Sequence, residues 1–227
     1  MKNKKLMISL ISTISLFCVF VLFTLLVKFV DVAYVGFTGK EIGLSSLNKL
    51  FYESVSVSEL FDKLSDAIMI VSVIIAMFIA ILGIVQLVKN KNLKAVDKEI
   101  YSFAIVLVML VIVYVLFEIV DLNFRPILIE GKVEASYPSS HTMLALTVFM
   151  CASYYGFSKL TTKRNRAICL SVAVILIVVT ILFRVLSGMH WITDIIASII
   201  LSLMLTSIYI LTINIFQKMV NKNGKQG

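Results

Sequence analysis

Charged residues, prolines and cysteines are all scarce in this chain of 227 residues. Only 15% of the residues are Asp, Glu, Lys or Arg and two are proline, whereas 60% are hydrophobic. This composition, with a mean hydropathy of +1.02, excludes an ordinary soluble globular domain. The three cysteines, Cys18, Cys151 and Cys169, are an odd number and lie inside apolar runs, so they provide no disulfide framework. The chain is therefore predicted to be an integral membrane protein.

Six apolar windows are long enough to cross a bilayer, whose core of about 30 Å requires roughly 20 helical residues. These windows lie near 6–30, 67–88, 100–121, 141–158, 168–186 and 194–216. Runs of this length without alternation of apolar and polar residues favour helices over barrel strands. We therefore predict an all-α fold, a six-span transmembrane helical bundle, with 1–227 forming a single membrane domain.

Lysine and arginine collect at alternate ends of these windows, which indicates the orientation of the chain. The clusters are Lys2, Lys4 and Lys5; Lys89, Lys91, Lys94 and Lys98; Lys159, Lys163, Arg164 and Arg166; and Lys218, Lys222 and Lys225. Such clusters mark the cytoplasmic side, so we predict a multi-pass protein of the cell membrane with both termini cytoplasmic. The formal net charge of +8 is then mainly a topology signal, and no nucleic-acid partner is expected.

Both histidines of the chain fall at the opposite, extracytoplasmic ends of the windows. The order of spans places Arg125 and Arg184 where the third and fifth end, and His141 and His190 where the fourth and sixth begin. Ionisable residues in membrane segments are rare and mark functional sites. We therefore expect an active site at the extracytoplasmic face.

The stretch RVLSGMHWITD, residues 184–194, has the spacing of an oriented base. His190 and Asp194 are four residues apart, so on one helical turn the carboxylate can hold a ring N–H and leave the other nitrogen free. A free imidazole nitrogen serves as a nucleophile or base, and the Arg184 guanidinium suits a phosphate oxyanion. The alternative is a structural His–Asp pair beside an arginine that extends to the interface.

The stretch PSSHT at 138–142 indicates a second part of the same site. Ser139 or Ser140 is placed to cap the fourth helix, whose first-turn N–H groups and dipole would attract an anion. His141 lies in that turn and is placed to protonate a leaving oxygen.

Together these residues resemble the tripartite signature of the type 2 phosphatidic acid phosphatase (PAP2) superfamily, integral membrane lipid phosphatases. The signature reads K-x6-R-P, P-S-G-H and S-R-x5-H-x3-D, and its parts occur in order within residues 118–194 of this chain. The resemblance implies hydrolysis of a lipid phosphate or diphosphate, such as undecaprenyl diphosphate, phosphatidylglycerol phosphate or phosphatidic acid. It implies no metal and no cofactor, and the expected partners are this substrate and membrane lipids.

The resemblance also implies a role for each matching residue. His190 would be the nucleophile that forms a phosphohistidine, Asp194 would orient it, and His141 would be the general acid. The substrate phosphate would be bound by Arg125, Arg184, Ser139 and Ser140.

Three positions depart from the signature. Glu118 stands where the signature has lysine, Ser140 replaces its glycine, and Phe183 replaces the serine before Arg184. We expect Glu118 to pair with Arg125, Arg184 or Lys132, because an unpaired carboxylate at this depth is unfavourable. Alternatively, it contacts the polar part of an unusual substrate or a cation, or it marks a divergent protein with weak or no activity. Lys132 is a candidate for the missing positive charge.

Two other functions remain open at this point. A lipid phosphotransferase would use the same residues with another hydroxyl in place of water. A non-enzymatic transporter or binding protein would use the basic pocket for an anionic ligand, although no internal repeat supports a transporter. The sequence leaves the oligomeric state open.

Overall fold

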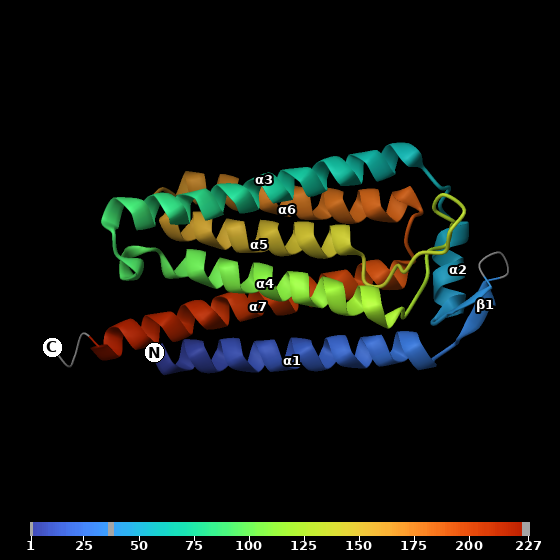
Figure 1. Ribbon diagram of the computed structural model, residues 1–227, viewed down its shortest axis with the longest axis horizontal. Coiled ribbons are helices and arrows are strands. Elements are labelled where there is room, and N and C mark those ends of the chain that lie inside the picture. Colours follow the sequence, from blue (N-terminus) through green and yellow to red (C-terminus); the bar gives the residue numbers. More distant parts are fainter. Residues whose placement is uncertain (1, 36–38, 224–227) are drawn as a thin grey trace.

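The computed structural model of the protein describes residues 2–35 and 39–223, and most of them belong to long helices that run along one axis (Figure 1). These helices are α1 (Lys2–Phe29), α3 (Glu59–Asn90), α4 (Lys98–Val120), α5 (Ser140–Lys159), α6 (Lys163–Ser187) and α7 (Ile192–Asn223). The start of α1 and the end of α7 lie at one end of the bundle, which we call the terminal end. The opposite end, with the connections 121–139 and 188–191, is the motif end.

Short elements cover the motif end. Strands β1 (Ala33–Val35) and β2 (Lys40–Ile42) pair antiparallel and form a short hairpin in a chain that is otherwise mostly helical, as the all-α prediction requires. Helix α2 (Ser45–Glu53) follows and lies across the bundle axis (Figure 1). At the terminal end, a 3-10 turn (Leu93–Ala95) connects α3 to α4.

Five of the long helices are long and apolar enough to cross a membrane, and α5 is not among them. The multi-pass character is therefore clear, while six spans stay a prediction. α5 packs against α3, α6, α7 and α4, and its Thr142 and Thr147 are fully buried. A helix surrounded by other helices instead of lipid can carry more polar residues, which accounts for its lower hydropathy.

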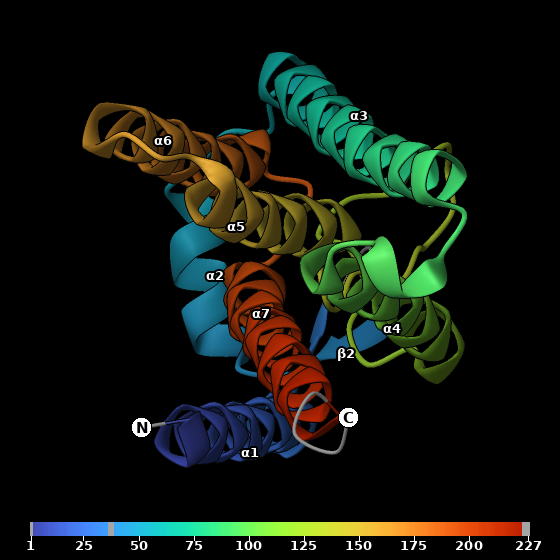
Figure 2. The same ribbon diagram turned by 90° about the vertical axis from the view of Figure 1, so that its left-hand side faces the viewer.

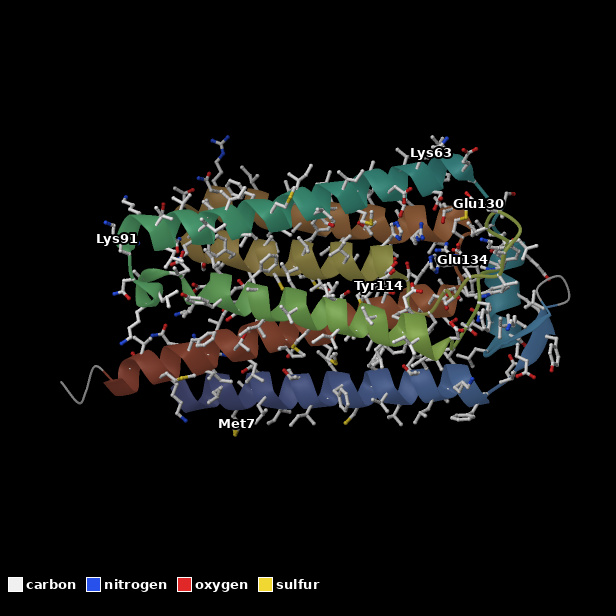
Figure 3. All side chains as sticks on the ribbon, in the orientation of Figure 1. Met7, Lys63, Lys91, Tyr114, Glu130 and Glu134 are labelled. Atoms are coloured by element: carbon white, nitrogen blue, oxygen red, sulfur yellow. The ribbon has the colours of Figure 1, made fainter. Side chains whose placement is uncertain are left out.

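The outer helices present their apolar side chains outward. Figure 2 shows α5 and α7 near the middle, with α1, α3, α4 and α6 around them. Many large hydrophobic residues on these four helices are exposed, among them Ile8, Phe78, Val108 and Ile175. Met7 points away from the bundle (Figure 3). Such a surface fits lipid contact.

Helix α3 begins at Glu59, eight residues before the predicted start of the second span at 67. Ser58 caps it by accepting from the Phe61 N–H, and Glu59 and Asp62 lie in its first turn, where acidic residues favour a helix N-terminus. The Ser58 N–H also donates to the Ser187 carbonyl (3.1 Å) at the end of α6. This bond fixes the added turns of α3 beside α6.

Candidate active site

The turn between α6 and α7 places His190 inside the motif end. Gly188 ends α6 with a φ of +66°, a conformation that L-residues rarely adopt. A Cβ at Gly188 would also lie 3.2 Å from Val57 Cα. The glycine therefore lets the chain reverse tightly, so that His190 returns toward Arg184 on the preceding helix.

Both ring nitrogens of His190 have partners, and these define its tautomer. Arg184 Nη2 lies 2.8 Å from Nε2, and because a guanidinium only donates, Nε2 must accept. Nδ1–H then donates to the Ser136 carbonyl at 3.0 Å, and Asp194 Oδ2 lies 3.4 Å from the same nitrogen. His190 is thus held neutral, with its Nε2 lone pair toward Arg184.

The surroundings of His190 favour this neutral form. Burial lowers the pKa of His190 well below its usual value, and the positive charges of Arg184, Arg125 and His141 lower it further. A nucleophilic imidazole requires an unprotonated nitrogen. The site therefore keeps the ring unprotonated at neutral pH.

Asp194 supports the loop as well as the ring. Its Oδ2 accepts from the Trp191 N–H (3.1 Å) and its Oδ1 from Asn123 Nδ2 (3.4 Å). The carboxylate is fully buried. The nearer partner of His190 is nevertheless the Ser136 carbonyl, so the orienting role predicted for Asp194 is shared with the backbone of the α4–α5 connection.

Arg184 is almost fully buried between two elements. Its Nη1 donates to Asp62 Oδ1 of α3 at 2.7 Å, while Nη2 contacts His190. A carboxylate from α3 thus partly balances the buried guanidinium. Phe183, which replaces the serine of the signature, packs its ring 5.6 Å from that of Phe61 and so joins α6 to the same turn of α3.

His141, in the first turn of α5, also pairs with α3. Its Nε2 lies 3.1 Å from Asp66 Oδ1, and 24% of its side chain is exposed. Its other nitrogen, Nδ1, is buried and has no hydrogen-bond partner among the described residues. His141 is therefore held at one nitrogen and unengaged at the other.

Arg125 projects from the connection between α4 and α5. Its backbone N–H donates to the Glu134 carbonyl (2.9 Å) and its Nε lies 3.2 Å from Glu134 Oε2, in an ion pair without hydrogen-bond geometry. Bridges at Phe124–Ala135 and Ile129–Lys132 shape the connection into a narrow ribbon. The ribbon thereby holds Arg125 at the site.

A small cavity of ≈ 30 Å³ lies between α4, the ribbon and α5. The residues that line it include Arg125, His190, Ser140 and Glu118. Nε of Arg125 and Nε of Arg184 are buried without hydrogen-bond partners in the described parts of the chain. Arg184 and His141 are not among the described residues that line the cavity, and Arg125 Nε already lies beside the Glu134 carboxylate. Buried donors are normally satisfied, so the unpartnered Arg184 Nε, next to His190, fits an anion.

Three predicted residues are placed differently from expectation. The Ser139 hydroxyl is buried against Thr142 Oγ1 (3.0 Å), and Ser139 is not among the described residues that line the cavity. Lys132 is exposed at the tip of the ribbon and does not line it either. Glu118 does, but it forms no ion pair with Arg125, Arg184 or Lys132 among the described residues. The expected pairing of Glu118 is wrong because Glu134 and Asp62 pair with the arginines instead.

Sequence reasoning missed Asp62, Asp66, Asn123 and the carbonyl of Ser136. The two aspartates had a detectable signal, because carboxylates four residues apart share a helix face and lie directly before an apolar run. The contact from Ser136 had none, since any residue type supplies a carbonyl.

Comparisons with known proteins agree with this architecture. Residues 120–218 match the family model of the PAP2 superfamily. No curated protein matches the chain. A solved structure, the transmembrane PAP2-type phosphatidylglycerolphosphate phosphatase from Bacillus subtilis, superposes with a TM-score of 0.59 at 16% identity, over 86% of this chain and 92% of that one. The matched segment includes His141, Arg184, His190 and Asp194, so over these residues the chain is similar to the PAP2 superfamily, and its fold is that of a transmembrane PAP2-type phosphatase.

Proposed function

We propose that the protein is a membrane lipid phosphatase that transfers a phosphoryl group to His190 Nε2 and then to water. The observation that carries the proposal is the buried, neutral His190, whose Nε2 lies beside Arg184 in a site with surplus cationic donors. The match of residues 120–218 to the PAP2 family model supports the phosphatase activity at this coarse level.

In the first step, the phosphoryl group binds Arg125, Arg184 and the first turn of α5 at Ser140. The Arg184 bond to Nε2 is released as Nε2 attacks phosphorus. The bond from phosphorus to the leaving oxygen breaks, and His141 gives a proton to that oxygen. The Asp194 carboxylate, 3.4 Å from Nδ1, stabilises the positive charge on the phosphorylated ring.

In the second step, water attacks phosphorus while His141 accepts one of its protons. The P–N bond breaks, inorganic phosphate leaves, and His190 returns to its neutral form. This step requires water to reach His141, which agrees with its partial exposure. A phosphotransferase would admit a hydroxyl in place of this water.

Three substrates fit the proposal: undecaprenyl diphosphate, phosphatidylglycerol phosphate and phosphatidic acid. The related fold of a phosphatidylglycerolphosphate phosphatase makes phosphatidylglycerol phosphate the first to test. Apolar Phe117 and Met143 line the cavity beside its polar residues, as a lipid substrate requires.

Phosphate release from the three lipids by purified protein in detergent, with and without chelator, tests the function. We expect release from at least one lipid with chelator present, together with an acid-labile phosphoprotein. Transfer to an added alcohol without free phosphate would indicate a phosphotransferase. The absence of turnover and of phosphoprotein would contradict the proposal.

We further propose that the motif end faces outward and that the termini are cytoplasmic. Cysteine labelling in intact cells tests this orientation. The variants are Lys91→Cys and Lys132→Cys, each made in a protein in which the three native cysteines have been replaced by serine. An impermeant thiol reagent should label only the Lys132→Cys variant. Labelling of the Lys91→Cys variant alone would reverse the orientation.

A further inference from the structure

A second cavity lies at the terminal end of the bundle, remote from the candidate active site. Its volume is ≈ 650 Å³, and its lining residues come from α1, α4, α5 and α7. Near the motif end α1 touches α4 through the Phe20–Phe117 ring pair, with centroids 5.9 Å apart. At the terminal end the four helices instead enclose the cavity.

Lysines from three different helices line this cavity. Lys5 comes from α1, Lys98 from α4 and Lys218 from α7. Lys98 Nζ donates to Gln217 Oε1, and no described carboxylate forms an ion pair with any of the three lysines. Three ammonium groups around one cavity favour an anion such as a phosphodiester.

Glu99 adds an acceptor to the same cavity. It is 9% exposed and lines the cavity beside Lys98. No hydrogen bond or ion pair joins its carboxylate to another residue of the described chain. Because Glu99 lines the cavity and has no donor from the described residues, its carboxylate can accept from a ligand that brings O–H or N–H groups.

An apolar groove continues from this cavity along α1 and α7. The neighbouring cavity of ≈ 480 Å³ shares Lys5, Tyr154 and Asn214 with the first. Farther along, apolar Ile8, Leu16, Leu203 and Ile210 line it together with four serine and threonine residues. The charged cavity thus opens into a channel of the kind that would accept an acyl chain.

We propose that this composite cavity binds an anionic phospholipid whose headgroup carries hydroxyl groups, of the phosphatidylglycerol type. Its phosphodiester lies among Lys5, Lys98 and Lys218, and a headgroup hydroxyl donates to Glu99. One acyl chain occupies the groove between α1 and α7. Basic pockets between membrane helices are known places for acidic headgroups. The lipid would fill the space between α1 and the rest of the bundle and so stabilise the fold.

Thermal unfolding in detergent tests the proposal, with Trp191 and the tyrosines as fluorophores. The probe is dioctanoyl-phosphatidylglycerol, and the neutral reference is dioctanoyl-phosphatidylcholine. At saturation we expect the glycerol lipid to raise the melting temperature by on the order of 5 °C over the reference. Free glycerol phosphate should have little effect, because it lacks the acyl chain. An equal shift with free glycerol phosphate would contradict lipid binding.

Matched charge variants locate the site. Lys5→Gln, Lys98→Gln and Lys218→Gln together should remove the shift. The control combines Lys89→Gln, Lys94→Gln and Lys163→Gln, exposed lysines at the same end that do not line the cavity, and it should keep the shift. Equal loss in both triple variants would mean general surface attraction and would overturn the proposal. If the first triple variant does not fold, Lys5→Gln and Lys218→Gln alone should each weaken binding.

A lipid without hydroxyl groups tests the role of Glu99. Dioctanoyl-phosphatidylmethanol has the same charge as the glycerol lipid but no donor for the carboxylate. We expect wild-type protein to bind the glycerol lipid about tenfold more tightly, the size of one hydrogen bond to a charged group. Equal affinity for the two lipids would refute the proposed contact with Glu99.

Discussion

The two histidines of the chain stand in contrasting surroundings at the same site. The His190 side chain is 2% exposed, and both of its nitrogens are engaged. The His141 side chain is 24% exposed and is held at one nitrogen by Asp66. A nucleophile benefits from a fixed lone pair, whereas a group that exchanges protons with water must remain accessible. The contrast supports different roles for two identical side chains.

Removal of His190 should have the largest effect. His190→Ala deletes the atom that is proposed to bond to phosphorus, so we expect turnover to fall by at least about 10⁴-fold. Phosphate release and labelling of the protein by phosphate should disappear together. More than 1% of wild-type activity in a folded variant would falsify the covalent route.

Removal of His141 should have a large effect that depends on the leaving group. With a lipid phosphate, His141→Ala should lose about 10²–10⁴-fold, the usual contribution of a general acid. With an aryl phosphate the first step needs no proton, so phosphoprotein should accumulate while its hydrolysis is slow. Equal losses of phosphoprotein formation with both substrates would contradict the proposed division of roles.

The long helices and the gathering of the motif residues could be predicted from the sequence. Apolar runs identified each long helix to within a few residues at most ends, and alternation of spans placed His141 near His190. The start of α3 could not be predicted, because Asp62, Lys63 and Asp66 interrupt the apolar pattern. These charges are tolerated because Asp62 and Asp66 pair with Arg184 and His141 from other helices.

The details of the site depend on contacts that leave no signature in residue types. Ser136 binds His190 through its carbonyl and Asn123 bonds Asp194 from 71 positions away. Glu118 was expected beside an arginine because it is a carboxylate at the right depth. Glu134 and Asp62 are carboxylates that could equally pair with an arginine. Only the path of the chain determines which carboxylate lies beside each arginine.

Loss of the partner of His141 should have a moderate effect. Asp66→Asn keeps the shape but removes the charge, and we expect about a tenfold loss with a lipid phosphate and a smaller one with an aryl phosphate. Asp66→Glu should recover part of the activity. As a matched control, Glu59→Gln changes a carboxylate that, among the described residues, pairs only with exposed Lys63. If Asp66→Asn lowers activity equally with the lipid phosphate and the aryl phosphate, Asp66 has a structural role instead.

Mild acid should have little effect on the nucleophile. Since the pKa of His190 is lowered by burial and by Arg184, Arg125 and His141, the ring stays neutral as the pH falls through 6.5. Phosphoprotein formation from saturating aryl phosphate should therefore change little between pH 7 and pH 6. An unperturbed histidine, with a pKa near 6.5, would lose about threefold over this range. Stopped-flow measurement of the labelled protein distinguishes these outcomes.

Substitution of Glu118 should have the smallest effect and should increase anion binding. Glu118 lines the cavity with Arg125 and His190 but does not hold either arginine, so Glu118→Gln should leave the fold intact. The carboxylate repels a phosphoryl group, and its removal should tighten inhibition by vanadate about threefold to tenfold, as expected for a partly solvated charge. Glu118→Lys, which restores the charge of the family signature, should tighten it further. Weaker vanadate inhibition in the Gln variant would instead show that Glu118 positions the cationic groups through a contact made only when an anion is bound.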